Sequence, residues 1–489
     1  MRPLSMERAD AVSHLAGRRM ERSRCREAIQ LADAAIVLCR AVGAQARLGA
    51  TLSIKAISAA SLGRAAETRA AIDDSMELGR GLGDDGLLDV GSIVANDAAA
   101  LWNIGDFDRV PTFVDESIAW ATEIGGERGW IPWLEPSAAI AAFLTGDWRA
   151  AEERLERFRA DAEASYPLMD TLLIEGHLAA GHGDRARVES LLADNALASS
   201  STAYEAMYLH VRAVAALWDR DAGAAAGLAE RALDVVSTLE EIPILTDIIK
   251  TAARAYADLA ERHVTSRAGP RAALAAGRAD ELRKVALALD GGTYLDGAMS
   301  TPWMHAIALE VVAESGRAAQ RSDPAAWDAA AGAHVAVGTM PDVAYCRYRE
   351  GEALLLAGDR AGATARVAEA HAIAARIGMT PLVGQIEALA RRARLTLEVP
   401  TAAIDPAVSI APVDPWGLSL REREVLALLG EGRTNRQIGE ALFISDKTAS
   451  VHVTHILVKM GVSSRTEAAL LAGRSGVAAT GTARIATEG

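Results

Sequence analysis

The first 400 residues alternate between segments of helical period and short turns. Apolar residues recur at spacings of three and four, which is typical of helices with one buried face. These segments end at a glycine, often Gly-Asp, and an alanine-rich segment follows: "SLGRAAETRAAI", "NIGDFDRVPTFV", "LTGDWRAAEERL", "GHGDRARVESLL" and "LAGDRAGATARV". Glycine adopts the left-handed conformation that ends a helix, and aspartate is a good N-cap for the next one. The pattern therefore predicts helices joined by tight turns.

The turns recur at a nearly constant interval. The first five junctions are spaced 42, 41, 37 and 37 residues apart, at Gly63, Gly105, Gly146, Gly183 and Arg220, with Gly358 as a later copy. Arg220 stands in the glycine's place in "LWDRDAGAAAGL". Stacked helix–turn–helix hairpins produce such a period. From about 262 to 345 the period is hard to follow, and "RHVTSRAGPRAALAAG" is interpreted as a loop or an interruption.

We therefore predict an all-α fold, with a helical-hairpin repeat solenoid over residues 1–397. The alternative is that an alanine-rich helical protein produces the Gly-Asp pattern by chance. A Pro-rich linker is predicted over 398–416, because the prolines there prevent a helix and favour an extended tether: Pro400, Pro406, Pro412 and Pro415. A small four-helix domain is predicted over 417–474, followed by a disordered tail over 475–489.

The predicted four-helix domain has unusually complete helix-start signals. Three pairs form capping boxes, in which a Ser or Thr stands three residues before a Glu or Gln: Ser419–Glu422, Thr434–Gln437 and Ser464–Glu467. Ser445 caps the remaining helix. The helical spacing assigns an inward-facing core of Leu426, Leu429, Ile438, Leu442, Ala449, Val453, Ile456 and Met460. Four short helices would share this core.

Once that core is fixed, the third helix turns a slim and nearly uncharged face outward. Its residues are Lys447, Ser450, Val451, Thr454 and Val458. A face meant only for solvent would carry Glu and Lys instead, whereas small side chains suit close approach to base edges in the major groove. The pattern predicts a helix-turn-helix. A purely structural cap of four helices is the alternative.

The stretch "LSLREREVLALLGEGRTNRQIGEALFISDKTASVHVTHILVKMGVSSRTEAALLA" is similar to the LuxR-type helix-turn-helix domain along its whole length. The resemblance implies that the third helix is the recognition helix. Base-contacting positions of the family fall on Ser450, Val451 and Thr454. Positions that meet phosphates fall on Thr434, Asn435, Lys447, Thr448, His452 and Lys459, and Arg436 is a further candidate. The fourth helix, roughly Thr466–Leu471, often forms the dimer contact in this family.

Departures from the family and simpler roles leave several assignments open. Many members have Lys where this chain has Ser450, and several have Lys where it has Thr454, so the preferred DNA sequence does not transfer from relatives. His452 also suits packing at the edge of its helix. Lys459 also suits the negative end of the helix dipole. Arg436 also suits a plain surface position.

Helical repeats followed by a LuxR-type domain resemble the C-terminal part of large ATP-binding LuxR-family regulators, and the repeats resemble tetratricopeptide repeats. No G-x-x-x-x-G-K-[ST] motif occurs, and none of the five lysines follows a glycine, so the phosphate-binding loop of the ATPase module is missing. Two interpretations stay open: a short, nucleotide-independent relative, or a fragment truncated at the N-terminus.

Charge and composition narrow the class of protein. The net charge is −14, while residues 416–476 carry eight Lys+Arg against six Asp+Glu, so an anion-binding surface is expected near the C-terminus. Three scattered cysteines fit a reducing cytoplasm. Neither a membrane-spanning run nor a secretory signal is indicated. No H-E-x-x-H, G-x-S-x-G or C-x-x-C motif occurs, so we expect no enzyme activity, metal or cofactor.

Four tryptophans are the candidate ligand-binding residues of the repeat region: Trp120, Trp130, Trp133 and Trp148. Such a group suits a concave groove for a small molecule or peptide, and packing in the repeat core is the alternative. The sequence as a whole predicts a bacterial, cytoplasmic transcriptional regulator that binds double-stranded DNA as a homodimer, with an effector or protein partner at the repeats. A repeat-based interaction scaffold with an accessory DNA-binding domain is the competing hypothesis.

Overall fold

The structure is a computed structural model that separates into two compact units, Met1–Val399 and Pro400–Gly489. It describes residues 5–81, 87–123, 127–161, 169–193, 201–296 and 298–397 of the first unit. In the second unit it describes 425–426, 428–430 and 432–442, and singly 453, 456, 457, 460, 462, 464, 465 and 468. The predicted linker, 398–416, and tail, 475–489, therefore lie wholly outside the described residues.

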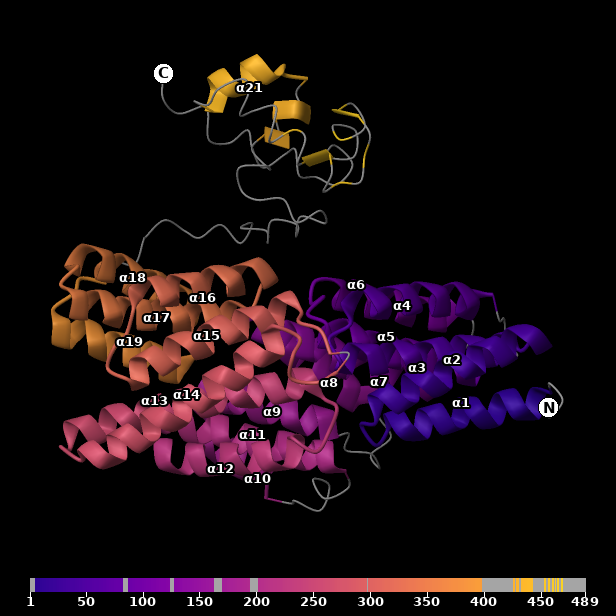
Figure 1. The fold of residues 1–489 in the computed structure, drawn as a ribbon, viewed down its shortest axis with the longest axis horizontal. Helices are drawn as coiled ribbons and strands as arrows, with labels where there is room; N and C mark the ends of the chain where they lie inside the picture. Colours follow the sequence, from indigo (N-terminus) through magenta and orange to yellow (C-terminus); the bar gives the residue numbers. More distant parts are fainter. Residues whose placement is uncertain are drawn as a thin grey trace. The chain divides into compact units, whose positions relative to one another are not determined.

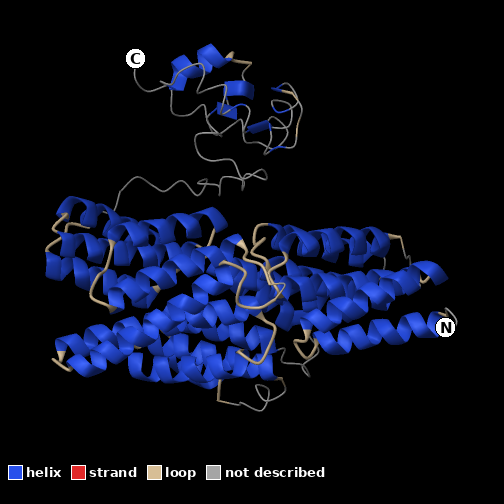
Figure 2. Ribbon diagram, viewed as in Figure 1, coloured by secondary structure: helices blue, strands red, loops and turns tan. Residues whose placement is uncertain are grey.

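The described residues are helices and turns, with no strand among them (Figure 2). The all-α prediction is confirmed. The helices of the first unit (Figure 1) are α1 Met6–Met20, α2 Cys25–Val42, α3 Gln45–Ser61, α4 Ala65–Arg80, α5 Leu87–Asn103, α6 Arg109–Glu123, α7 Glu127–Thr145, α8 Trp148–Asp161, α9 Met169–His182, α10 Arg185–Leu191, α11 Thr202–Trp218, α12 Ala222–Val236, α13 Ile242–Thr265, α14 Gly269–Asp290, α15 Pro302–Ala318, α16 Pro324–Val337, α17 Met340–Ala357, α18 Arg360–Ile377 and α19 Thr380–Ala393. Among the described residues, no helix combines the length and the apolar character that crossing a bilayer requires.

The predicted junctions are tight turns with a left-handed residue at each. The backbone φ angles are positive at Gly63, Gly105, Gly146, Gly183 and Gly358, and also at Arg220, which has φ 61°. Asp N-caps follow as expected: the Asp184 carboxylate accepts the Arg187 N–H at 3.0 Å, and the Asp359 carboxylate accepts the Gly362 N–H at 2.9 Å. These local signals set where the helices end and begin.

The interpretation of residues 262–277 as a loop or an interruption is wrong. α13 runs to Thr265 and α14 starts at Gly269, so only a short turn separates them. Arg267 takes the left-handed conformation there, with φ 58°, and Gln320 does the same between α15 and α16, with φ 59°. The regular spacing of turns could not be followed in this part of the sequence for two reasons. Residues other than glycine occupy the left-handed positions, and α13 and α14 are long, at 24 and 22 residues.

Each hairpin packs on the next, with the odd-numbered helices forming a continuous layer. Each odd-numbered helix from α3 to α13 contacts the next odd-numbered helix, and the even-numbered helices pair with their hairpin partners. Alanine fills many of these contacts, as at Ala252, Ala253 and Ala255 on α13, all fully buried. Small side chains let neighbouring helices approach closely.

The row of hairpins also curls until early and late helices meet. α7 contacts α17, and α9 contacts α19. A nitrogen of the His182 ring hydrogen-bonds the Gly378 carbonyl oxygen at 3.0 Å, and the Glu240 N–H donates to the Ser23 carbonyl at 3.1 Å. The face of the odd-numbered helices is therefore turned toward a common interior.

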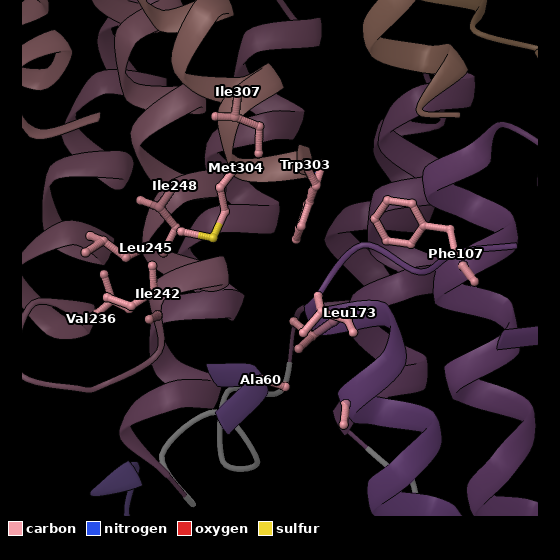
Figure 3. Close-up of a cluster of buried hydrophobic side chains, with 14 of the residues drawn as sticks. Ala60, Phe107, Leu173, Val236, Ile242, Leu245, Ile248, Trp303, Met304 and Ile307 are labelled. Carbon is pink, nitrogen blue, oxygen red and sulfur yellow. The ribbon is translucent and has the colours of Figure 1, made fainter. Parts of the chain in front are cut away.

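The turn between α5 and α6 packs against the start of α15 inside this unit. Phe107 and Trp303 meet edge to face, with ring centroids 5.4 Å apart. Figure 3 shows Met304, Ile248 and Leu245 gathered on the other side of Trp303 from Phe107. Side chains about 200 positions apart in the sequence thus share one core.

Candidate functional sites

The C-terminal unit has the buried core that the sequence predicted. Leu426, Leu429, Ile438, Val453, Ile456 and Met460 are all buried and form one cluster, together with Val425, Leu428 and Ala468. The side chains of Leu442 and Ala449, the other predicted core residues, lie outside the described residues. Because Val453, Ile456 and Met460 recur at three- and four-residue spacing, one helical face is turned into this core.

Helix α21 (Asn435–Leu442) begins with the predicted capping box. The Thr434 N–H donates to the Gln437 Oε1 atom at 2.9 Å, and the Gln437 N–H donates to the Thr434 Oγ1 atom at 3.3 Å. Both bonds satisfy backbone donors that the first turn of a helix leaves unpaired. Ile438 anchors the helix in the core, so the box holds the N-terminus of α21 at the domain surface.

The segment before α21 is fixed from two sides. Gly432 has φ +79°, and the Arg433 N–H donates to the Leu428 carbonyl at 3.1 Å, which ends the preceding helix. The guanidinium of Arg465 donates to the Arg433 carbonyl, so the region that opens with Ser464 is tied to the same turn. In the sequence, Arg465 was only part of the stretch that resembles the LuxR-type domain. Its hydrogen bond depends on the tertiary fold.

Three of the predicted DNA-binding residues lie in the described part. Thr434 and Arg436 are exposed, and Asn435 is half-buried, with its Oδ1 atom buried and without a hydrogen-bond partner among the described residues. All three lie at the N-terminus of α21, where backbone N–H groups and the helix dipole favour an anion. The remaining candidates lie outside the described residues: Lys447, Thr448, Ser450, Val451, His452, Thr454 and Lys459.

The C-terminal unit matches known proteins. Residues 417–472 match the family model described as bacterial regulatory proteins, luxR family. The Bacillus subtilis transcriptional regulatory protein LiaR is 53% identical over 58 residues, which are 12% of this chain and 28% of LiaR. The transcriptional regulatory protein DegU of Brevibacillus brevis is 57% identical over 51 residues, 10% of this chain and 22% of DegU.

A third relative is the DNA-binding transcriptional activator DevR/DosR of Mycobacterium tuberculosis, 45% identical over 56 residues, 12% of this chain and 26% of DevR/DosR. The chain thus spans about a quarter of the length of these curated relatives. The helical core and these matches together define a small DNA-binding module. Residues 417–472 are a LuxR-family helix-turn-helix domain of the kind found in bacterial transcriptional regulators.

The repeat unit contains a second candidate site, a partly open cavity of about 200 Å³. Its wall comes from the odd-numbered helices α5 to α17, the first residue of α8 and Met379 before α19. Much of the wall is aromatic: Trp102, Phe143, Trp148, Trp218, Trp303 and Tyr345. Apolar cavities with a few polar groups are the usual form of small-molecule sites in proteins.

The predicted tryptophan group is only partly found at this cavity. Trp148 lies in the wall, stacked beside Phe143 with ring centroids 5.7 Å apart. Trp120 is not part of the wall and lies against Gly79. The side chains of Trp130 and Trp133 lie outside the described residues. Sequence analysis missed Trp102, Trp218 and Trp303, because no local signal marks residues from separate hairpins that converge.

Helix α13 supplies the charged side of the cavity. Asp247, Lys250 and Arg254 share one helical face and line the wall. The Lys250 Nζ atom lies 2.9 Å from an Asp247 oxygen and 3.0 Å from an Asp342 oxygen. Burial alone would lower the pKa of Lys250, but these two carboxylates hold it well above its ordinary value. Lys250 is therefore a permanent cation that is already paired.

A hydrogen-bonded group of three buried side chains lies next to Asp342. The His334 ring hydrogen-bonds the Glu310 carboxylate at 3.1 Å and the Thr339 hydroxyl at 2.7 Å, so both ring nitrogens are engaged. Glu310, His334 and Cys346 place their possible ligand atoms within 4.8 Å of one another. Burial raises the pKa of the Cys346 thiol, which disfavours the thiolate that binds metals. Glu310, His334 and Thr339 therefore form a buried hydrogen-bond network.

Arg254 differs from the other charged residues of the cavity. Its guanidinium carbon lies 4.3 Å from the centre of the Trp218 ring and 4.1 Å from the centre of the Tyr345 ring. Its Nε atom is buried and has no hydrogen-bond partner in the part of the chain that the structure describes. Aromatic rings thus hold the guanidinium without a carboxylate to pair with its hydrogen-bonding edge.

Proposed function

We propose that this chain is a sequence-specific bacterial transcriptional regulator. Its C-terminal domain would bind double-stranded DNA, and the cavity of its repeat unit would bind a small-molecule effector that controls DNA binding. The protein would act in the cytoplasm, by binding alone and without catalysis. Transcriptional regulation in this form combines one module that recognises DNA with another that senses a signal.

The observation that carries the proposal is the C-terminal core together with the capped start of α21. The buried positions at 426, 429, 438, 453, 456 and 460 agree with the register in which this domain resembles LuxR-type domains. In that register Ser450, Val451 and Thr454 meet bases, whereas Lys447 and Lys459 meet phosphates. The exposed N-terminus of α21 adds backbone N–H groups aimed at the phosphate backbone.

Two copies are proposed to bind two half-sites through the fourth helix, roughly Thr466–Leu471. Ala468 is fully buried within the domain core, so other positions of this segment would form the dimer contact. Two-fold symmetry of the protein then predicts a palindromic DNA site. Analytical ultracentrifugation with and without the selected duplex measures this stoichiometry directly.

The test is selection of DNA sequences from a random pool by the purified full-length protein, followed by affinity measurements across a salt series. Lys447→Ala/Lys459→Ala is expected to weaken binding about equally on all sequences. Two lost phosphate contacts should flatten the slope of log K against log salt by about 1.8. Ser450, Val451 or Thr454 substitutions should instead change which sequence is preferred.

Lys284→Ala is the matched control, because Lys284 is exposed on the repeat unit and pairs with Asp280 at 2.9 Å. It removes one positive charge, against two in the Lys447/Lys459 variant, at a site remote from α21 in the sequence, and the salt slope should not change. An unchanged slope in the Lys447/Lys459 variant would contradict the phosphate assignment. Failure of the parent protein to enrich any sequence would contradict the regulator and leave the interaction scaffold.

A further inference from the structure

Arg254 lies in the wall of the repeat-unit cavity, and the carboxylates near it form ion pairs with two other arginines. Arg317 lies 2.8 Å from Asp258 and 2.7 Å from Glu314, and Arg349 lies 3.0 Å from Asp258. These arginines, with Arg254, lower the pKa of Asp258 to about 2 against the effect of burial, so it stays ionised. Arg254 therefore lies beside an ion-pair network in which no described carboxylate accepts its hydrogen bonds.

Two aromatic rings hold the Arg254 guanidinium in place. Its central carbon lies over the faces of the Trp218 and Tyr345 rings, and the hydroxyl of Tyr345 is held in turn by Arg349 at 3.0 Å. The rings bind a guanidinium through its charge and use none of its N–H donors, so the edge keeps the fork that binds a carboxylate through two parallel hydrogen bonds. The site is organised before any ligand arrives, which favours affinity.

A second unpaired donor lies in the same wall. The Trp303 side chain is 3% exposed, and its indole Nε1 atom is buried without a hydrogen-bond partner among the described residues. Buried donors are nearly always satisfied in proteins, by a protein group, an ordered water or a ligand, so two residues of one cavity wall carry donors for which the described residues supply no acceptor. A ligand with an anionic oxygen group supplies such acceptors.

The acidic groups of the cavity are paired within the chain. Asp247 and Asp342 both contact Lys250, and Glu310 accepts a hydrogen bond from His334. Burial raises the pKa of Glu310, which favours its neutral form. Burial also lowers the pKa of His210 to about 4, so that ring is neutral at neutral pH. Arg254 is thus the cation of the wall that no described carboxylate pairs with, whereas Lys250 has two carboxylate partners.

The rest of the wall indicates the chemical type of the ligand apart from its anionic group. Trp102, Phe143 and Trp148 offer flat apolar surfaces on which an aromatic ring can stack. A phosphate monoester would bring close to two negative charges against one open guanidinium. A volume of about 200 Å³ favours a small ligand over a peptide or a nucleotide.

We infer that the cavity binds a small aromatic monocarboxylate, with the carboxylate on the edge of Arg254 and the Trp303 indole N–H as an additional donor. This inference deepens the effector role proposed above, and its binding step can be measured without DNA. The aromatic ring of the ligand lies among the tryptophans. Quenching of intrinsic tryptophan fluorescence and isothermal titration calorimetry both report on such binding.

The experiment titrates the full-length protein with phenylacetate and indole-3-acetate, and with two matched analogues, phenylacetamide and phenethylamine. We expect the carboxylates to bind at least tenfold more tightly than the neutral amide and the cationic amine. Arg254→Gln should weaken carboxylate binding at least tenfold and leave amide binding unchanged. Trp303→Phe, which keeps a ring and removes the N–H donor, should weaken carboxylate binding severalfold.

Arg212→Gln is the matched control. Arg212 also lies over an aromatic ring, Tyr208 at 5.8 Å, but it is exposed on α11 and does not line the cavity. The Arg212→Gln variant should bind the carboxylates as tightly as the parent protein does. Arg254→Lys keeps the charge without the fork, and it should fall between the parent and Arg254→Gln if the variants melt at the parent's temperature.

Three results would overturn the inference: no binding of either carboxylate, equal binding of acid and amide, or parental binding by Arg254→Gln. The same protein preparation is tested for DNA selection. If the protein selects a DNA sequence but binds neither carboxylate, only the inference of a carboxylate ligand is wrong. Carboxylate binding without DNA selection removes the proposed regulator and keeps the ligand site.

Discussion

The contact between the early turn at Gly63 and the segment at Met299 provides a sharp test of how the repeat unit closes on itself. Gly63 has φ +73°, and a Cβ atom placed on it would overlap the Met299 carbonyl oxygen. The Met299 N–H also donates to the Leu62 carbonyl at 2.9 Å. Gly63→Ala therefore strains the turn and separates two segments that are far apart in the sequence.

The magnitude follows from two contributions. A left-handed alanine costs about 1–2 kcal/mol, partly offset by about 0.4–1 kcal/mol from the less flexible unfolded chain. Moving the Met299 segment away adds about 0.5–1.5 kcal/mol for the weakened hydrogen bond and about 1–3 kcal/mol for displaced packing. We expect Gly63→Ala to lower the free energy of unfolding of the repeat unit by about 3 kcal/mol.

Gly358→Ala isolates the backbone contribution. Gly358 has φ +85°, but no atom lies within 4 Å of the position its Cβ would take. Its cost should be about 1 kcal/mol, from the left-handed conformation alone. Urea unfolding of the full-length variants, followed by circular dichroism at 222 nm, measures both values. Equal destabilisation by the two substitutions would refute the argument that the Gly63 turn is held against Met299.

Three further substitutions test the caps and the buried charges. Thr434→Ala removes the N-cap of α21 and should cost about 1 kcal/mol, seen as an earlier thermal transition of the C-terminal domain and weaker DNA binding on all sequences. Burial raises the pKa of Asp97 to about 8, above its unfolded value, so stability falls as pH rises from about 4 to about 8. Asp97→Asn should gain stability over the parent across that range, and a constant difference between the two would contradict the assignment. Lys250→Met leaves two half-buried carboxylates without their cation and should cost up to about 3–5 kcal/mol near neutral pH, measured as the melting temperature of the full chain. Adding Asp247→Asn and Asp342→Asn should recover most of that loss; no recovery would show that packing and not charge was lost.

Local signals predicted the helix boundaries well because each depends on only a few neighbouring residues. The glycine at 183 and the aspartate at 184 end one helix and cap the next through backbone bonds within the turn itself. The two turns that the sequence analysis missed also have a local cause. Arg267 and Gln320 adopt the left-handed conformation without the glycine that marks it in a sequence.

The C-terminal domain was predictable for a related reason. Its core comes from a stretch of about fifty residues, so periodicity alone assigned Leu426, Ile438 and Met460 to it. The capping box of Thr434 and Gln437 needs no distant partner. By contrast, the bond from Arg465 to the Arg433 carbonyl required the fold, because it joins two helical segments through a side chain.

The sequence by itself determined the helices, their turns and the presence of a small helix-turn-helix domain, since these depend on neighbours a few residues away. Tertiary structure alone decided which aromatic residues face the cavity. Trp148 lies in its wall with Trp102, Trp218 and Trp303, whereas Trp120 does not. The cavity forms because small rotations between successive hairpins add up until α7 and α9 meet α17 and α19. These rotations depend on packing along the whole row of hairpins. The same packing leaves Arg254 between Trp218 and Tyr345, with no carboxylate partner among the described residues.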